Sequence, residues 1–520
     1  MILSLTSFRD KLAGCWAGKN IGGVLGAPFE GYRQINKADF YTQDLSMGPP
    51  PNDDLDLQIV WLAAVEKYGR NVNAAILGEY WLSYVIPNWV EYGTGKSNLR
   101  AGLMPPLSGE VNNGYKNSCG CFIRSELWAC LAPGHPEIAA RYAYEDAIVD
   151  HAGEGMYGEI FFAALESAAF VESDTRKLLE IGLSYIPSDC VTAKAIGMAV
   201  ACYDQKTPFE EARKRIHNVA PGTFGVLIWK VSEVPTAGNE GMAFGEPGFD
   251  APENVAFAIA GWLYGEGDFG RSLCLANACG EDTDCTCATL GAIYGIVRGE
   301  SGLPEKWKKP LDDRIVTMCI DNTSKALWIP KTAAELAERI LRIVPGFLGP
   351  DLCDPFACGG MQIRCSENEL RCPRHRDYLT GIDGERKGGA KALTIPELCA
   401  LSPYVVRYEF PAFQALIDYR GSAFFQRGVN RSIGVKLLDS GAMNQQQWAR
   451  ISVYLPQGAG TVGASCVELP LNTVVGACAE TTFEITTEQF SGGKLELMVD
   501  ISLVGRHSSG AIKVTLLCNG

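Results

Sequence analysis

GEDTDCTCATLGAIYGIVRG, residues 280–299, is the stretch of sequence that decides the fold. Its acidic residues Glu281, Asp282 and Asp284 stand just before a run of small and apolar residues at helical spacing. Acidic side chains at a helix N-terminus interact favourably with the helix dipole, by about 0.3–1 kcal/mol each. The stretch therefore predicts a helix over 285–298 that starts from an acidic loop.

A second acidic cluster likewise stands at the start of a predicted helix. In PPPNDDLDLQIVWLAAVE, residues 49–66, the prolines block an earlier helix and Asn52 is a suitable N-cap. Asp53, Asp54 and Asp56 then fall in the first turn of the following helix. Each aspartate taken alone is explained as a helix-capping residue. If the two helix starts converge, however, their aspartates repel each other unless a cation lies between them.

A hard divalent cation fits these ligands. Magnesium, or manganese, prefers carboxylate, amide, hydroxyl and water oxygens in octahedral geometry. Two ions about 3.5–4 Å apart could share carboxylates and orient a water or the hydroxyls of a substrate. We therefore expect a magnesium centre, with two ions, where the acidic helix starts meet.

A third stretch, GCWAGKNIGGVLGAPFE at residues 14–30, belongs to a helix predicted over 8–25 with Ser7 as its N-cap. Gly14, Gly18 and Gly22 recur every four residues and share one face of that helix. Side chains are absent from this face, so another backbone can approach closely.

Composition limits the class of protein. The 520 residues exceed one compact domain, and 47% hydrophobic residues provide true cores. A net charge of -14 is opposite to that of a general nucleic-acid binder. No apolar run reaches about 18 residues, and the N-terminus lacks a signal-peptide core. We expect a cytoplasmic protein without nucleic-acid or membrane partners.

The residue composition and hydrophobic pattern divide the chain into three regions. Residues 1–345 are predicted to form a helical domain that carries the catalytic site. Residues 346–402 are predicted to form an irregular Cys-rich connection. Residues 403–520 contain short runs of alternating apolar and polar residues and are predicted to form a smaller β-sandwich. The sandwich would serve packing, homo-oligomer formation or ligand contact. Further helices are predicted near 55–68, 72–84, 136–149, 155–172, 190–203, 208–217, 253–264 and 268–278.

The segment over residues 86–121 is rich in Gly, Pro and Asn, which argues against a helix, and it contains several aromatic residues. It is a candidate substrate loop, with a purely structural loop as an equal alternative.

Nineteen cysteines are scattered along the chain, so most are expected to be buried free thiols. Four of them, with His375, could bind a structural zinc, although they lack the paired CxxC spacing of a strong zinc motif. These four are Cys353, Cys358, Cys365 and Cys372.

Taken together, three motifs resemble those of the ADP-ribosylglycohydrolase superfamily. They are the glycine-rich stretch at 14–30, NDDLDLQ at 52–58, which is similar to the TDDT metal motif, and the stretch at 280–299, which is similar to the GGDTDT motif and its helix. The resemblance spans about residues 8–345. It implies a mainly α fold, an orthogonal multi-helix bundle with a two-magnesium centre, and hydrolysis of a glycosidic bond to an ADP-ribosyl group.

The resemblance also implies roles for individual residues. Glu30 matches the catalytic glutamate, with Asp56 as a second catalytic candidate. One metal would be held by Asn52, Asp53 and Asp54, and the other by Asp282, Asp284 and Cys285. Candidate substrate-binding residues are Asn113, Asn117, Gly120, Arg124 and His151.

Departures from the family pattern leave alternatives open. Asn52 and Cys285 replace threonines, and a thiol is a poor magnesium ligand. The second ion could therefore bind more weakly, be a softer ion such as manganese, or have its ligands completed by Asp56 or a water. NSCGCFIRSELW at 117–128 differs from the family's GNGxxMR segment. The substrate could therefore be an ADP-ribosylated molecule or a nucleoside or small glycoside of carbohydrate metabolism. A binding or regulatory protein with a decayed metal site is the alternative from another class.

Overall fold

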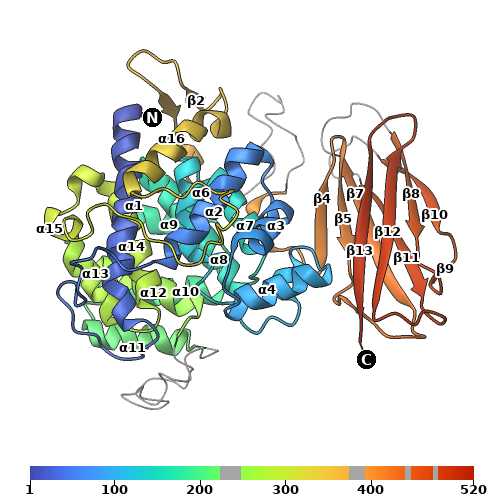
Figure 1. Ribbon diagram of the computed structural model, residues 1–520, viewed down its shortest axis with the longest axis horizontal. Helices are drawn as coiled ribbons and strands as arrows, with labels where there is room; N and C mark the ends of the chain where they lie inside the picture. The colour runs from blue at the N-terminus through green and yellow to red at the C-terminus, as the bar shows by residue number, and fades with distance from the viewer. Residues whose placement is uncertain (223–247, 374–392, 440–446, 472–477, 520) are drawn as a thin grey trace. The chain divides into compact units, whose positions relative to one another are not determined.

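The chain folds into two compact units in the computed structural model (Figure 1). One unit contains Met1–Lys96 and Asn112–Cys372 and is helical, and the other contains Ser97–Val111 and Pro373–Gly520 and is built mainly of strands. The structure describes all residues except 223–247, 374–392, 440–446, 472–477 and 520.

The helical body predicted from the sequence is confirmed, and the predicted ranges agree with the helices to within a few residues. The helices additional to those predicted are α4, α5, α6, α9, α15, α16 and α17. The helices are α1 Leu5–Gly26, α2 Asp53–Tyr68, α3 Ala74–Tyr84, α4 Val90–Ala101, α5 Leu107–Glu110, α6 Ser125–Leu131, α7 Pro136–Ala147, α8 Glu154–Ala169, α9 Thr175–Leu183, α10 Val191–Asp204, α11 Phe209–Val219, α12 Ala251–Tyr264, α13 Phe269–Ala278, α14 Thr283–Arg298, α15 Glu305–Lys308, α16 Ala333–Leu348 and α17 Ile395–Cys399.

The start of α1 differs from the prediction. The N-cap is Ser4, whose Oγ accepts a hydrogen bond from the backbone N–H of Ser7 at 3.3 Å. Ser7 therefore lies in the first turn, because the strand β1 (Ile2–Ser4), paired with β3 (Gln362–Arg364), ends where the helix begins.

The segment over 86–121 is also more helical than its composition predicts, since it contains α4 and α5. The ammonium group of Lys96, buried in α4, donates hydrogen bonds to the carbonyls of Val85 and Pro87 at 2.9 and 2.6 Å. Gly95 lacks a Cβ, which would lie 2.9 Å from that of Asp150. Tertiary contacts thus outweigh the low helix propensity of glycine here.

The β-sandwich predicted for the C-terminal region is confirmed. Its two five-stranded sheets have the orders β10-β8-β12-β13-β6 and β4-β5-β7-β11-β9, and every pair is antiparallel except β13 with β6. The strands are β4 Val405–Glu409, β5 Phe413–Asp418, β6 Phe424–Phe425, β7 Arg431–Asp439, β8 Gln447–Tyr454, β9 Gly460–Val462, β10 Cys466–Leu471, β11 Cys478–Thr486, β12 Lys494–Leu503 and β13 Ser509–Cys518.

The sandwich core draws on a distant part of the sequence. Leu103, Leu107 and Val111 are at most 2% exposed and pack in the same cluster as Ile451 and Val499 from the sheet. The segment Ser97–Val111 is therefore a structural part of the sandwich unit.

The cysteines considered for zinc do not gather among the described residues. Cys353 lies in β2 (Cys353–Asp354) of the small sheet β1-β3-β2, Cys358 is exposed, and Cys365 and Cys372 are buried apart from them. No group of three ligand atoms that includes these thiols occurs in the described part of the chain. His375 lies outside the described residues.

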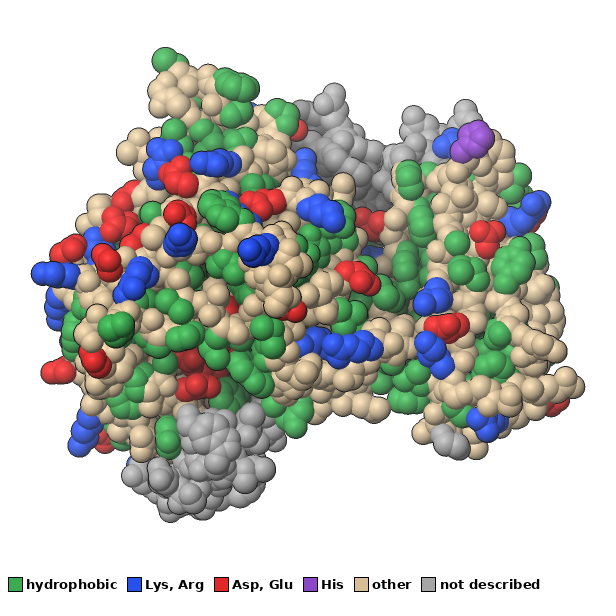
Figure 2. All heavy atoms as spheres, viewed as in Figure 1, with side chains coloured by type: hydrophobic (Ala, Val, Ile, Leu, Met, Phe, Trp, Pro, Cys, Tyr) green, Lys and Arg blue, Asp and Glu red, His purple; other side chains and the backbone are tan. Residues whose placement is uncertain are grey.

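Charged side chains of both signs are interspersed over the face of the helical unit that Figure 2 shows. Among the described helices, none is long and apolar enough to cross a membrane.

Candidate metal centre

Two of the sequence motifs meet because α1 packs against α14 along the glycine stripe (Figure 1). A Cβ on Gly18 would lie 2.0 Å from the carbonyl oxygen of Gly291, and one on Gly22 would lie 1.9 Å from that of Cys287. The pairing is antiparallel, since residues later in α1 meet residues earlier in α14. The end of α1 and Glu30 just beyond it are thereby brought to the acidic start of α14.

The first acidic cluster is fixed by the predicted cap. Asn52 is the N-cap of α2, and its Oδ1 accepts a hydrogen bond from the backbone N–H of Asp54 at 3.0 Å. Gly23 leaves space for this amide, because a Cβ there would lie 2.1 Å from Asn52 Nδ2. The buried carboxylate of Asp54 therefore has a defined position at the start of α2.

The second cluster is fixed by a strained loop. Glu281 has a positive φ of 63°, and Arg33 Nε donates a hydrogen bond to its Oε1 at 2.6 Å. The N–H of Asp282 donates to Asn254 Oδ1 at 3.0 Å. These contacts hold Asp282 at the N-cap position of α14, one residue before the helix.

The two clusters converge, as the sequence predicted for a metal centre. Three overlapping groups have ligand atoms that lie within 4.8 Å of one another: Glu30, Asp282 and Asp284; Asp54, Asp284 and Cys285; and Cys119, Asp282 and Cys285.

Electrostatics make this convergence unfavourable in the bare protein. Burial raises the pKa of Asp53 to about 6, and the charge of Asp282 adds to the rise. Burial and the charges of Glu30 and Asp282 raise the pKa of Asp284, while Lys19 opposes the effect of burial at Asp54. Like charges held together in a low-dielectric site raise carboxyl pKa values in this way.

The residues present fit a divalent cation. Asp54 Oδ2, Asp282 Oδ1 and Asp284 Oδ1 are buried and have no hydrogen-bond partner among the described residues. Buried polar atoms are normally satisfied, so unpartnered oxygens on carboxylates that converge within 4.8 Å are suited to a cation.

Asp56 is placed differently from the other aspartates of its motif. Its Oδ2 accepts hydrogen bonds from the backbone N–H groups of Met318 and Cys319 at 2.7 and 2.5 Å. Burial raises its pKa to about 7. Asp56 belongs to none of the three groups above, so its contacts anchor a loop, and its catalytic role stays a prediction.

The predicted substrate residue Arg124 lies in an internal ion cluster. It is fully buried, and its guanidinium lies 3.1 Å from Asp146, 2.9 Å from Asp150 and 3.8 Å from Glu159. Burial favours a raised pKa at Asp150, but Arg124 and His151 outweigh it and lower that pKa.

His151 and Gly120 lie in the same buried region. His151 Nε2 lies 2.9 Å from Ser118 Oγ and its Nδ1 lies 2.9 Å from Asp150. A Cβ on Gly120 would lie 2.3 Å from a carboxylate oxygen of Glu91. His151 is thus packed inside the protein, whereas the half-buried Gly120 lies against Glu91 in the loop that precedes α6.

The two predicted asparagines shape that loop. Asn113 Nδ2 donates to the carbonyl of Asp150 at 2.8 Å, and Asn117 Oδ1 accepts from the N–H of Glu154 at 3.3 Å. Substrate contact by Asn113, Asn117, Gly120, Arg124 and His151 stays a prediction.

Two residues beside the centre were not identified from the sequence. Cys119 donates its thiol hydrogen to Asp282 Oδ2, and the fully buried Lys19 lies 2.7 Å from Glu126. Lys19 carried a signal in the sequence, since it is the one charged residue in the glycine-rich part of α1, residues 14–26. No sequence signal pointed to Cys119, because a single cysteine in a loop belongs to no pattern that indicates its contact partner.

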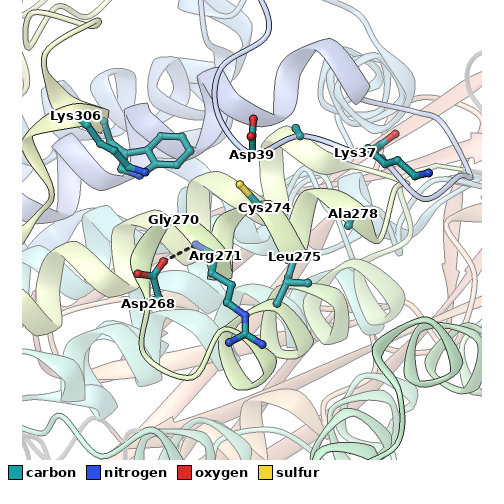
Figure 3. Close-up of a pocket in the computed structure, with 12 residues that line it drawn as sticks. Lys37, Asp39, Asp268, Gly270, Arg271, Cys274, Leu275, Ala278 and Lys306 are labelled. Atoms are coloured by element: carbon teal, nitrogen blue, oxygen red, sulfur yellow. Dashed lines mark hydrogen bonds between the residues drawn. The ribbon is translucent and has the colours of Figure 1, made fainter.

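A surface pocket of about 360 Å³ lies away from these residues (Figure 3). It is lined by the 36–39 loop and by residues of α13 and α15, such as Arg271 and Trp307. The carboxylate of Asp268 there accepts a hydrogen bond from the N–H of Arg271 and caps α13, as Figure 3 shows. None of the converging carboxylates lines this pocket.

Fold and site together define a protein whose helical unit carries a buried, carboxylate-rich candidate metal centre. The sequence profile of the family described as ADP-ribosylglycohydrolase matches residues 4–343, and the chain belongs to this family. Membership implies a hydrolase and supports glycohydrolase activity.

Other comparisons add the following. A solved structure titled "ADP-ribosylglycohydrolase-related protein complex" is 18% identical, with 65% of this chain and 100% of that chain covered and a TM-score of 0.42. Among curated proteins, no sequence matches this chain.

Proposed function

We propose that this protein is a divalent-metal-dependent glycohydrolase that cleaves an N- or O-glycosidic bond to an ADP-ribosyl or similar furanosyl group. The observation that carries the proposal is the convergence of Glu30, Asp54, Asp282 and Asp284 around buried oxygens without partners. Family membership supplies the reaction class. A cytoplasmic location, as expected from the sequence, is part of the proposal.

Magnesium, with manganese as its substitute, is the proposed cofactor. Asn52, Asp53 and Asp54 would hold one ion, and Asp282 and Asp284, with Cys285, would hold the other. When bound, such ions neutralise the carboxylates and polarise oxygens of the substrate or of water.

Glu30 is the proposed acid–base group. It is half-buried, follows the short 3₁₀ helix Ala27–Phe29, and comes within 4.8 Å of the Asp282 and Asp284 carboxylates. A carboxylate there can take a proton from an attacking water, and in its protonated form it can give one to a leaving group. The helix starts behind it keep the neighbouring aspartates in fixed positions.

A neutral glycoside or nucleoside is the second candidate substrate, and a specific observation favours it. Three cations near the site are already paired in the interior: Lys19 with Glu126, Arg33 with Glu281, and Arg124 with Asp150. A pyrophosphate group requires Arg, Lys or helix N-termini that are available to it. The N-termini of α2 and α14 are at the site, but each carries aspartates that would repel a phosphate. Hydrolysis assays on ADP-ribosylated protein, nucleosides and small furanosides distinguish these substrates.

Metal binding tests the proposal first. Magnesium or manganese added to EDTA-treated protein should raise the melting temperature, since a ligand at 100 times its Kd adds about 2.7 kcal/mol to the free energy of unfolding. Asp284→Asn should abolish this rise. Asp174→Asn is the matched control, because Asp174 caps α9 away from the centre.

Metal binding and hydrolysis together test the proposed function. Calorimetry without binding of either ion at millimolar concentration contradicts the metal centre. Binding without hydrolysis of any substrate class instead supports the alternative of a metal-binding regulatory protein.

A further inference from the structure

Two buried thiols meet at one end of the metal centre. Cys119 and Cys285 are 1% and 8% exposed, and their Sγ atoms and a carboxylate oxygen of Asp282 lie within 4.8 Å of one another. Cys119 donates to Asp282 Oδ2, and Cys285 donates to Asp54 Oδ1 at 3.5 Å. Both thiols therefore point toward the carboxylates.

The position of Cys119 is fixed by contacts of its own backbone. Its N–H donates to the carbonyl of Phe249 at 2.6 Å, and the neighbouring Ser118 pairs with Asp250 in a β-bridge. Cys285 is fixed as the third residue of α14, in the first turn of that helix. The two thiols thus come from separate elements that are each anchored independently.

An independent observation indicates a ligand at this end. Asp282 is only 2% exposed, yet its Oδ1 has no hydrogen-bond partner among the described residues. Its other oxygen already faces Cys119. A cation bound by this carboxylate would give the first oxygen a partner, and a carboxylate oxygen of Asp282 lies within 4.8 Å of both thiols.

The ligand types differ between the two ends of the centre. Glu30 and Asp284 offer hard oxygens, which suit magnesium and manganese. Cys119 and Cys285 offer soft sulfur, which suits zinc and similar ions. Three protein ligands with a fourth position open are typical of catalytic zinc sites.

We propose that Cys119, Cys285 and Asp282 form a site for a thiophilic divalent ion, zinc above all, beside the hard-ion site of the same centre. This inference rests on the proposed function, because it assigns an ion to one end of the proposed metal centre. On binding, each coordinating thiol releases its proton to solvent and a metal–sulfur bond forms, without any change of oxidation state.

Cobalt is the probe for this site. The full-length protein should carry Cys358→Ser and Cys466→Ser, which remove two exposed thiols that could bind metal elsewhere. Cobalt added to this protein in its metal-free form should produce a thiolate-to-metal charge-transfer band. Excess magnesium should leave the band intact, and zinc should remove it.

Variants assign the band to its residues. Cys119→Ser and Cys285→Thr should each reduce the band and weaken zinc binding roughly tenfold or more. Cys119→Ser should leave magnesium binding unchanged, since Cys119 is not among the proposed magnesium ligands. Cys285→Thr should tighten magnesium binding, because it replaces a sulfur ligand with a neutral oxygen. Cys121→Ser is the matched control. Cys121 is fully buried, lies two residues from Cys119, and its thiol contacts the Glu159 carboxylate at 2.8 Å, outside the centre. It should leave the band unchanged.

X-ray absorption of the zinc-loaded parent protein provides a test that needs no substitution at the site. Sulfur neighbours at about 2.3 Å from zinc are expected. Zinc surrounded by oxygen and nitrogen alone, or a cobalt band that survives in both variants, overturns the thiophilic site. Neither result affects the proposed glycohydrolase, which fails instead if no divalent ion binds or no glycoside is cleaved.

Discussion

Glu30 combines proximity to the aspartates with partial exposure, and this combination separates its chemical role from a structural one. Its charge raises the pKa of Asp284, so removing the charge relieves repulsion in the metal-free protein. We expect Glu30→Gln to melt at or above the wild-type temperature and to lose about 10²–10⁴-fold in turnover, because an amide cannot exchange the proton.

Steady-state kinetics and thermal melting check this pair of effects. Glu210→Gln is the control for the loss of a carboxylate at a helix start, since Glu210 is an exposed glutamate in the first turn of α11, outside the centre. Wild-type turnover in Glu30→Gln on the true substrate would move acid–base catalysis to another group, with Asp56 next.

Glu91 predicts a pH dependence of stability. Burial raises its pKa to about 7, although His151 opposes the effect, and its Oε2 has no partner among the described residues. The folded state therefore holds a proton that the unfolded chain releases near its ordinary pKa of 4.5. This stabilising contribution is full at low pH and is lost as the pH rises toward 7.

Glu91→Gln isolates this contribution. The stability of the wild type relative to the variant should fall by about 3 kcal/mol between pH 4.5 and 7, since each pKa unit corresponds to about 1.4 kcal/mol. Urea unfolding of both proteins at several pH values measures the difference. A constant difference would show that folding does not raise the pKa of Glu91.

At the scale of elements, the packing of α1 on α14 depends on glycine. A Cβ on Gly22 would lie 1.9 Å from the backbone carbonyl oxygen of Cys287, and a backbone cannot move aside as a side chain can. Gly22→Ala should therefore destabilise the protein by about 1–3 kcal/mol or more, as overpacking does, and weaken metal binding by displacing Asp282 and Asp284.

The matched control is Gly197→Ala in α10, where no atom lies within 4 Å of the added Cβ. It should stabilise the protein by about 0.5–1 kcal/mol, because alanine favours a helix more than glycine does. Denaturation followed by tryptophan fluorescence measures both. Equal effects of the two substitutions would mean that α1 and α14 can separate without cost.

The predictions from sequence succeeded where one element carries its own pattern. The glycine stripe, the Asn52 cap and the acidic helix starts are local patterns, and they led to α1, α2 and α14. The contact of Cys119 with Asp282 joins residues 163 positions apart, and no local sequence pattern at either residue predicts it. α4 was missed because contacts of Lys96 and Gly95 with other elements, absent from any local pattern, stabilise it.

At the scale of the whole molecule, the sandwich unit is discontinuous in sequence. Leu103 and Leu107 lie within the first part of the chain, yet they are fully buried in the core formed with strands from 405 onward. Burying a leucine side chain contributes about 1.5–3 kcal/mol. A chain that ends at Cys372 would leave both leucines without their partners.

We therefore expect the shortened chain to self-associate through the exposed apolar side chains of Ser97–Val111. The full chain should not associate through this segment, because the sandwich core buries it. Light scattering and gel filtration at matched concentrations measure the difference. The double substitution Leu103→Ser and Leu107→Ser should prevent self-association of the shortened chain. In the full chain it should lower the free energy of unfolding, because a buried hydroxyl without a hydrogen-bond partner costs about 1–3 kcal/mol. A shortened chain that stays dispersed without the serines would mean that the helical unit can cover Ser97–Val111 by itself.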